Sequence, residues 1–511
     1  MDGQGSDLDD WGPFGRPLFD DPTARRLSRV GVIDVGSNSV RLVIFDGAAR
    51  SPAYFYNEKI LCGLGTGLGE TGKLNPEGRE RALSAMTRFV AVALGAGVKD
   101  LTAVATAAVR DASDGAAFRA EVEKLTGLKI WVIDGREEAR LSAQGILLGW
   151  PGSYGLVCDI GGSSMELAEI EGGKVGRRET SPLGPLKLGL MDTPDARATE
   201  IDAHLTRMAD ALGKQRNRLF LVGGSWRAFA RVDMDRRDYP LRVLHEYRMT
   251  SEDVHATAAH IAASDPDALR ARCGVSSTRM RLLPVASEVL VRLTDRFRPR
   301  DIAISAYGIR EGLLYEQMPE RLRERDPLIE ACRFAEAKDA RLPGFGKRLF
   351  EFIRPVFPDA DLAEQRLMQA ACLLHDVSWR AHPDYRAEVC FDNATRANLG
   401  GLKHSERVFL GLALLHRYRN GRTGSRIEEL LPMLDADQQA RAERLGKAMR
   451  FGAMLWADAK DTGAKLKWRK KDETLLLTLK KRAQPLFGEV VQSRFKSLAD
   501  ALGATPEIEF D

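Results

Sequence analysis

The chain has 511 residues, of which 29% are charged and 44% hydrophobic, and its formal net charge is +4. This length suggests about three or four folded domains. The near-neutral charge does not favour nucleic acid as a partner, and no apolar run reaches the roughly 18 residues that span a membrane. The six cysteines form no C-x-x-C pair, which is typical of a reducing compartment, and we expect a cytoplasmic protein.

A β-hairpin with a polar turn is predicted over residues 31–47, GVIDVGSNSVRLVIFDG. An apolar run ends in Asp34, a glycine and hydroxyl turn follows, and a second apolar run completes the hairpin. We expect Gly36 to take a positive φ and to let the backbone approach a ligand closely. The side chains that would donate to phosphate oxygens in this turn are Ser37, Asn38 and Ser39.

Three further elements are predicted before residue 150. Residues 76–94 have helical spacing. Residues 101–110, LTAVATAAVR, read as a buried strand that ends near Arg110, whose planar guanidinium could hold two phosphate oxygens or could be an ordinary surface group. Residues 131–149, WVIDGREEARLSAQGILLG, predict a strand, a turn and a helix. Glu137 and Glu138 would fall in the first turn of that helix, where carboxylates commonly complement the helix dipole.

The first hairpin is repeated without a gap over residues 156–172, LVCDIGGSSMELAEIEG. Asp159 takes the place of Asp34, and Glu166 stands where the first copy has Arg41. This asymmetry predicts a division of labour: Asp159 and Glu166 hold a metal, with Asp34 as a further candidate ligand, while the first loop and Arg41 face phosphates. The second turn would bind phosphate through Gly161, Gly162, Ser163 and Ser164.

Two more motifs follow the repeat. Residues 220–231, FLVGGSWRAFAR, predict a strand, a turn and a helix whose N-terminus favours an anion. The turn residues are Gly223, Gly224 and Ser225, and the bulky Trp226 is expected to intrude on any nucleoside site beside them. In SAYGIREGLLYE, residues 305–316, we expect Arg310 and Glu311 to form a structural pair.

Five motifs in this order resemble the exopolyphosphatase and guanosine pentaphosphate phosphohydrolase family of the actin, sugar kinase and Hsp70 superfamily. They are DVGSNSVRL, ATAAVRDA, IDGREEARL, DIGGSSMEL and SAYGIREGLLYE. The resemblance implies an α/β fold with two duplicated actin-like (ribonuclease H-like) domains, followed by a mainly α-helical HD-like region. We expect a flexible leader over residues 1–29, which are rich in Gly, Pro and Asp. The expected domains are residues 30–149, 150–322, 323–460 and 461–511, the last a small α+β domain.

The family resemblance also implies a reaction. It places the catalytic base at the glutamate before Ala-Arg, which is Glu138, with Glu137 in reserve, and a phosphate contact at Arg110. The implied cofactor is Mg²⁺, with K⁺ as a candidate monovalent ion, and the implied assembly is a homodimer. The implied activity is processive hydrolysis of the terminal bond of inorganic polyphosphate by water. The alternatives are 5′-phosphohydrolysis of guanosine pentaphosphate (pppGpp), a non-catalytic sensor of polyphosphate or the (p)ppGpp alarmones, and, fitting less well, an actin-like kinase.

The C-terminal region carries one further resemblance, because CLLHDVSW, residues 372–379, is similar to the His-Asp helix of HD phosphohydrolases. Its ligand set looks incomplete, since Gly346, Lys347 and Arg348 stand where the first His is expected, so we expect a scaffold without its own metal. If the nearby basic residues face the cleft of the first two domains, they would form a track for a long polyanion. The alternative is that they are interspersed charges on solvated helices. The track residues are Lys403, His404, Arg407, Arg417 and Arg419.

Overall fold

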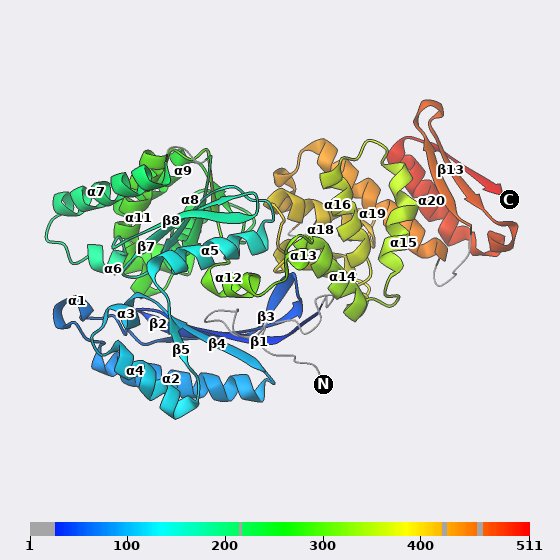
Figure 1. Ribbon diagram of the computed structural model, residues 1–511. Coiled ribbons are helices and arrows are strands. Elements are labelled where there is room, and N and C mark those ends of the chain that lie inside the picture. Colours follow the sequence, from blue (N-terminus) through cyan, green and yellow to red (C-terminus); the bar gives the residue numbers. More distant parts are fainter. Residues whose placement is uncertain (1–25, 214–216, 422–426, 457–462) are drawn as a thin grey trace, which may run out of the picture. The chain divides into compact units, whose positions relative to one another are not determined.

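A computed structural model describes residues 26–213, 217–421, 427–456 and 463–511. The chain divides into two compact units, Met1–Pro327 and Leu328–Asp511 (Figure 1). The predicted boundary after residue 322 lies just ahead of this division. Most of the predicted leader lies outside the described residues, and its last four residues already belong to the first strand, which begins at Arg26.

Unit 1 contains two sheets with the same plan. The first is built from β1 (Arg26–Val35), β2 (Ser39–Ala48), β3 (Ser51–Leu61), β4 (Asp100–Ala105) and β5 (Ile130–Val132). The second is built from β6 (Gly155–Ile160), β7 (Met165–Glu171), β8 (Lys174–Ser181), β9 (Arg218–Gly223), β10 (Arg248–Met249) and β11 (Asp301–Ile304). The order β3-β2-β1-β4-β5 in the first sheet is repeated as β8-β7-β6-β9-β11 in the second. The predicted duplication is confirmed.

Helices accompany each sheet, most of them on its outer face, while two of them lie between the sheets (Figure 1). Those of the first half are α1 (Leu68–Thr71), α2 (Pro76–Gly95), α3 (Ala107–Asp111), α4 (Gly115–Thr126) and α5 (Gly135–Gly149). Those of the second half are α6 (Pro185–Leu188), α7 (Pro194–Leu212), α8 (Gly224–Arg236), α9 (Ser251–Ala263), α10 (Pro266–Cys273), α11 (Ser277–Phe297), α12 (Ile309–Glu316) and α13 (Glu320–Arg323). Within the described ranges, none of the helices combines the length and apolar character needed to cross a membrane.

Helices α5 and α12 lie side by side between the two sheets (Figure 1). Their backbones approach so closely that a Cβ on Gly312 would lie 1.8 Å from the carbonyl oxygen of Leu141, and one on Gly145 would lie 2.4 Å from that of Gly308. A single apolar core surrounds the pair and draws on both sheets, with Phe45 on one side and Phe220 on the other. The α5–α12 pair therefore joins the two halves of unit 1.

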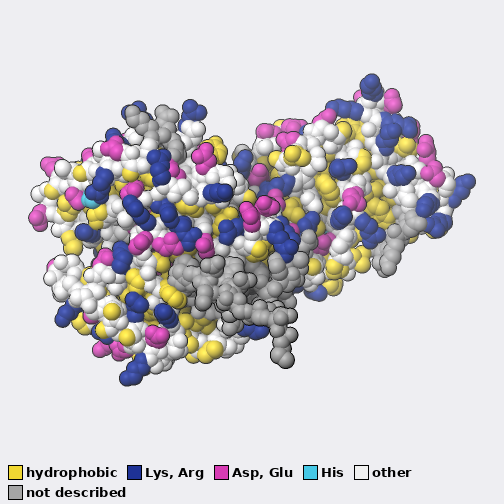
Figure 2. All heavy atoms as spheres, viewed as in Figure 1, with side chains coloured by type: hydrophobic (Ala, Val, Ile, Leu, Met, Phe, Trp, Pro, Cys, Tyr) yellow, Lys and Arg dark blue, Asp and Glu magenta, His cyan; other side chains and the backbone are white. Residues whose placement is uncertain are grey.

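Unit 2 is mainly helical and ends in a small sheet. Its helices are α14 (Pro327–Asp339), α15 (Phe345–Ile353), α16 (Leu362–Leu374), α17 (Arg386–Arg396), α18 (His404–His416), α19 (Ala436–Trp456) and α20 (Glu489–Leu502), with short 3₁₀ turns at Arg354–Val356, Glu428–Met433, Lys470–Asp472 and Lys481–Leu486. Its strands are β12 (Lys465–Arg469), β13 (Thr474–Leu479) and β14 (Thr505–Phe510), in the order β12-β13-β14. Lys and Arg side chains gather on the surface of this last segment (Figure 2). The predicted change to a helical C-terminal region is confirmed.

The close contact at Gly312 predicts opposite effects of one substitution at two helical glycines. Gly312→Ala should lower the free energy of unfolding by at least about 2 kcal/mol, because a methyl group cannot share space with the Leu141 carbonyl. Gly95→Ala is the control, since Gly95 ends α2 and an added Cβ there would have nothing within 4 Å, and it should be neutral or stabilise by up to about 1 kcal/mol. Denaturant unfolding of the full chain measures both, and equal midpoints would contradict the packing described for α5 and α12.

Candidate functional site

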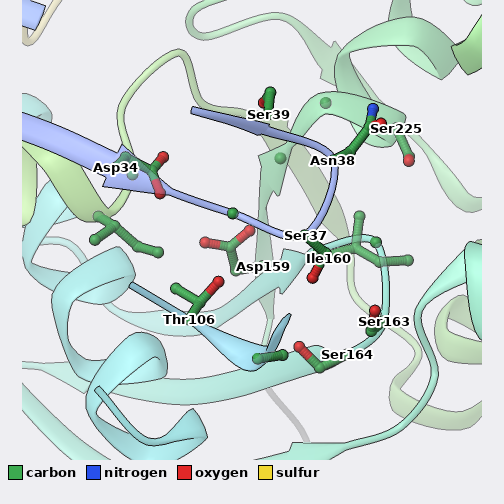
Figure 3. Close-up of a pocket in the computed structure, with 18 of the residues that line it drawn as sticks. Asp34, Ser37, Asn38, Ser39, Thr106, Asp159, Ile160, Ser163, Ser164 and Ser225 are labelled. Carbon is green, nitrogen blue, oxygen red and sulfur yellow. The ribbon is translucent and has the colours of Figure 1, made fainter. Parts of the chain in front are cut away.

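The two repeated hairpins end at one cavity of unit 1. The turns are closed by the same backbone bond, from Gly36 N to Ser39 O at 3.0 Å and from Gly161 N to Ser164 O at 2.9 Å. Both turns and Asp159 surround the cavity (Figure 3), whose volume is about 230 Å³. The predicted residues that line it are Asp34, Gly36, Ser37, Asn38, Ser39, Arg41, Glu138, Asp159, Gly161, Gly162, Ser163, Ser164, Gly223, Gly224 and Ser225.

The reason predicted for the turn glycines is wrong. Neither Gly36 nor Gly161 has a positive φ, and a Cβ on either would make an ordinary contact, 3.5 Å from the nearest atom. The glycine that needs its freedom is Gly223, where φ is 117°. A Cβ there would lie 2.6 Å from the carbonyl oxygen of Ile160 and 3.3 Å from Oδ1 of Asp159. Gly223 therefore leaves room for the Asp159 carboxylate at the cavity wall.

Buried carboxylates converge on the cavity from several elements. Asp34 and Asp159 end the equivalent strands β1 and β6, and Glu138 reaches the cavity from α5. Glu166 is not in the lining, but it lies directly opposite Asp159 in the register of strands β6 and β7. The hydroxyl of Thr180 donates a hydrogen bond to Oε1 of Glu166 at 3.2 Å. The Oε2 atoms of Glu138 and Glu166 are buried and accept no hydrogen bond from the described residues.

This crowding of carboxylates favours their neutral forms. Burial, followed by the neighbouring charges of Glu166 and Asp159, raises the pKa of Glu138 well above its ordinary value, and the nearby Arg110 opposes this only in part. Burial and then Asp159 raise the pKa of Glu166 to about 8. A cation or a hydrogen-bonded water among these groups would relieve the repulsion.

The two neighbouring glutamates of α5 have different surroundings. Asp134 caps the helix by accepting a hydrogen bond from the backbone N of Glu137 at 2.8 Å. The Glu137 carboxylate then binds Arg140 at 2.6 and 2.8 Å, and Arg140 also binds Glu316 at 2.6 Å. Glu138, one position later, turns inward and is only 6% exposed. The structure thus places Glu138 at the cavity and holds Glu137 in an ion-pair network.

Cationic side chains line the cavity together with the carboxylates. Besides the predicted Arg41, the lining includes Lys59, Arg227, Arg279 and Arg310. The sequence did not identify Lys59, Arg227 and Arg279 as site residues, because the three do not share one motif. Lys59 could have been found from the hairpin register, because it lies directly opposite Arg41 in β2 and β3. Arg110 is outside the lining, and its guanidinium donates to the carbonyl of Ile133 at 3.2 Å.

Arg310 does not form the predicted pair with Glu311. The Glu311 carboxylate accepts hydrogen bonds from Tyr54 Oη at 2.8 Å and from Gly308 N at 2.7 Å. Arg310 is only 8% exposed and lines the cavity. Within the described ranges its guanidinium has no hydrogen bond or ion pair; burial lowers its pKa, but the charges of Glu311 and then Asp34 outweigh burial and raise it. Arg310 is therefore a buried cation available to an anionic ligand.

Trp226 does not intrude on the cavity, so that prediction is wrong. The side chain is fully buried and belongs to the apolar core behind the second sheet, beside residues such as Phe229 and Leu283. Strand β9 and helix α8 meet at the predicted turn, and Ser225 is the last turn residue at the cavity. Because α8 directs the indole away, the bulk of Trp226 excludes no ligand.

The predicted polyanion track in unit 2 is wrong for its central residue. Arg407 is 1% exposed, and its guanidinium donates to the carbonyls of Ala397 at 2.8 Å and Leu399 at 2.7 Å. His404 and Arg417 are buried as well. The two remaining track residues, Lys403 and Arg419, are at least partly exposed. Arg407 thus stabilises the connection between α17 and α18.

The His-Asp pair of unit 2 forms internal contacts. His375 is buried and donates through Nδ1 to the carbonyl of Cys372 at 2.8 Å. Both carboxylate oxygens of Asp376 accept hydrogen bonds from Arg341, one of them at 2.8 Å. Burial, then the charge of Arg417, lowers the pKa of His375 to about 4. The Arg341 guanidinium balances the charge of Asp376, and the HD-like scaffold itself stays a prediction.

Two family models match this chain. A model described as the Ppx/GppA phosphatase family matches residues 43–321, and one described as the C-terminal part of exopolyphosphatase matches residues 331–508. Exopolyphosphatase 1 of Mycobacterium tuberculosis is 33% identical over 143 residues, 27% of this chain and 42% of the relative. Retrograde regulation protein 2 of Saccharomyces cerevisiae is 24% identical over 435 residues, 76% of this chain and 72% of the relative. The match with the mycobacterial relative thus spans about two fifths of that protein.

Solved structures with the same fold include an exopolyphosphatase from Cytophaga hutchinsonii, with a TM-score of 0.52 and 23% identity over 57% of this chain and 98% of that one. A Ppx/GppA family member from Aquifex aeolicus has a TM-score of 0.50 and 22% identity over 57% of this chain and 97% of that one. At these identities the likeness concerns the fold. It confirms the predicted pair of actin-like domains in unit 1.

The low pKa of His375 predicts an acid-sensitive stability. Unfolded His titrates near 6.5 and folded His375 near 4, so the unfolded chain binds the extra proton as the pH falls through this window. The loss should reach about 2 kcal/mol at about pH 5 relative to about pH 7. In His375→Gln this pH-dependent part should disappear, as measured by urea unfolding of the full chain at both pH values. His382→Gln is the control, because that side chain is 67% exposed, and an equal effect of both variants would contradict the prediction.

Proposed function

Because the chain belongs to the Ppx/GppA phosphatase family, we propose that it hydrolyses the terminal phosphoanhydride bond of inorganic polyphosphate. One observation carries this proposal: a buried carboxylate with an unpartnered oxygen, Glu138, lines a cavity that five cationic side chains also line. A polyphosphate end would bring the negative charge that these cations can bind. The carboxylate supplies the proton acceptor that an attacking water needs.

The lining favours polyphosphate over a nucleotide. Its apolar members are all aliphatic: Ala107, Ile160, Leu186, Val222, Leu282 and Ile309. Among the described lining residues there is no aromatic ring on which a guanine could stack, whereas five cationic side chains await phosphate oxygens. Hydrolysis of guanosine pentaphosphate remains the alternative activity, because the bond that is broken is the same and the purified protein can be offered both substrates.

In the proposed reaction Glu138 accepts a proton from the attacking water. Its raised pKa suits this role, because a more basic carboxylate is a better proton acceptor near neutral pH. The hairpin turns at Ser37 and Ser163 present hydroxyl and backbone N–H groups to the oxygens of the terminal phosphate. Arg310 holds the adjacent phosphate and balances the charge that develops on the leaving group. Water attacks phosphorus directly, so this scheme involves no covalent enzyme intermediate.

The carboxylate set is suited to Mg²⁺. Among the described residues no three His, Cys, Asp or Glu side chains meet closely enough to hold a metal alone. Mg²⁺, however, is commonly bound by one or two carboxylates together with substrate phosphates. Asp159 and Glu166 would hold it, with Asp34 across the cavity, and the unpartnered Oε2 of Glu166 fits such a cation. When bound, the ion would polarise the terminal phosphate.

Processive release is part of the proposal and follows from the number of phosphate contacts. A chain held at Lys59, Arg279 and Arg310 keeps several contacts after its terminal phosphate has left. Each lost phosphate shortens the chain without releasing it, because the remaining phosphates can shift by one position. The K⁺ ion, the homodimer and the cytoplasmic location stay predictions from the sequence.

The two glutamates of α5 provide a matched test of the base. Glu138→Gln should lower kcat for phosphate release from long-chain polyphosphate by about 100-fold or more, because the amide cannot accept the proton. Glu137→Gln should stay within about 10-fold of the wild type, since its carboxylate holds Arg140 instead. Phosphate release with Mg²⁺ measures both variants, with guanosine pentaphosphate offered in parallel.

The outcomes separate the candidate functions. Phosphate release with uncut long chains and without intermediate lengths supports processive exopolyphosphatase activity. A clear preference for guanosine pentaphosphate would favour the alternative. Retained binding with no release from either substrate would favour a sensor and contradict the proposed hydrolysis. A larger loss in Glu137→Gln than in Glu138→Gln would reverse the assignment of the base.

Arg310 is predicted to affect both binding and stability. Arg310→Met should raise KM for polyphosphate by about 10-fold or more, because a charge-assisted phosphate contact is lost. The free energy of unfolding should fall as well, because the charges of Glu311 and Asp34 stabilise this buried cation and would be left without it. Arg321→Met, at an exposed position of α13, is the control for both measurements. A loss of stability with an unchanged KM would show that Arg310 is structural.

A further inference from the structure

A buried serine on α5 contacts the cavity carboxylate Asp159. Ser142 is fully buried, and its hydroxyl donates to Oδ2 of Asp159. Serines inside helices often bond to a carbonyl of their own helix instead, as Ser287 of α11 does with Leu283 at 2.7 Å. Ser142 instead makes a hydrogen bond from α5 to Asp159 of β6. The stability of its own helix therefore does not explain why a hydroxyl is buried at this position.

This bond holds one carboxylate oxygen of Asp159. Oδ2 is engaged by Ser142, whereas Oδ1 lies against Gly223, at 3.3 Å from the position of a Cβ there. Gly223 leaves this space open, because it has no side chain. The carboxylate of Asp159, which lines the cavity, is therefore held between α5 and the turn after β9.

Ser142 also relates Asp159 to Glu138. The two α5 residues are four positions apart, which places them on the same face of the helix. One face of one rigid helix thus carries a carboxylate with an unpartnered oxygen and a hydroxyl that fixes a second carboxylate. A shift of Asp159 relative to Glu138 would require either this hydrogen bond or the α5–α12 packing to change.

We propose that Ser142 is a positioning residue that orients Asp159 to bind a divalent cation in this cavity. The inference rests on the proposed function for the role of the cation, but its test does not require activity. Hydrogen bonds from the protein to metal-binding carboxylates fix their orientation, and their loss typically weakens metal affinity by about 10- to 100-fold. Loss of the Ser142 hydroxyl should also raise the Mg²⁺ concentration that phosphate release requires.

The first measurement is the affinity of the full chain for Mn²⁺, with the free ion detected by electron paramagnetic resonance. Mn²⁺ is used because it prefers the same oxygen ligands as Mg²⁺. Ser142→Ala should raise the Kd for Mn²⁺ by about 10-fold or more. Ser142→Thr keeps the hydroxyl and should retain most of the affinity. Ser287→Ala is the matched control, because it removes a buried helical hydroxyl outside the cavity lining.

The second measurement is the Mg²⁺ concentration that gives half-maximal phosphate release. It should rise by about 10-fold or more in Ser142→Ala, while the rate at saturating Mg²⁺ recovers toward the wild type. An unchanged Kd for Mn²⁺ in folded Ser142→Ala would overturn the inference, as would an equal loss in Ser287→Ala or the absence of Mn²⁺ binding to the wild type. If Ser142→Ala does not fold, loss of Mn²⁺ affinity in Ser142→Cys supports the inference and full affinity overturns it. A wild type that binds Mn²⁺ but releases no phosphate contradicts the proposed function alone.

Discussion

The close contact between α5 and α12 places Glu138 and Arg310 at the cavity. Gly145 and Gly312 allow the two backbones to meet, and any side chain at Gly312 would overlap the Leu141 carbonyl. Because a single apolar core surrounds this pair and includes residues of both sheets, the position of α5 is fixed relative to both hairpin turns. Glu138 and Ser142 project from α5, and Arg310 projects from the start of α12. The close packing at Gly145 and Gly312 therefore sets where the side chains of Glu138, Ser142 and Arg310 lie.

The cavity brings two sets of like charges close together, its carboxylates and its cations. Carboxylates that face one another are driven toward their neutral forms, as the raised pKa of Glu166 indicates. The cations Arg41, Arg227 and Arg310 likewise repel one another, and burial lowers the pKa of Arg227 to about 10. A divalent cation with a phosphate chain would relieve both repulsions at once, since each brings the charge that one cluster lacks. Strained electrostatics of this kind are typical of functional sites.

The sequence predicted those features that are encoded locally. Each hairpin lies within one short segment, so the turn residues, Asp34 and Asp159 could be placed before the structure was known. Glu138 could be separated from Glu137 only through the family motif, and the ion pair with Arg140 gives the physical reason. Lys59, Arg227 and Arg279 come from three distant elements, and no local pattern relates them. Trp226 and Arg407 were misjudged because burial depends on which way a helix face turns, which tertiary packing decides.

The duplication also explains why the two halves can have different roles. The hairpin registers are equivalent, yet Asp34 faces Arg41 across its hairpin, whereas Asp159 faces Glu166. Helix α5 comes from the chain between the two copies and packs on β6, β7 and β8 of the second sheet. Its residues Glu138 and Ser142 are thereby close to Asp159, and no equivalent helix hydroxyl is hydrogen-bonded to Asp34 within the described ranges. The second half thus has two carboxylates, Asp159 and Glu166, where the first half has the Asp34–Arg41 pair, and the proposed division between cation and phosphate binding rests on this difference.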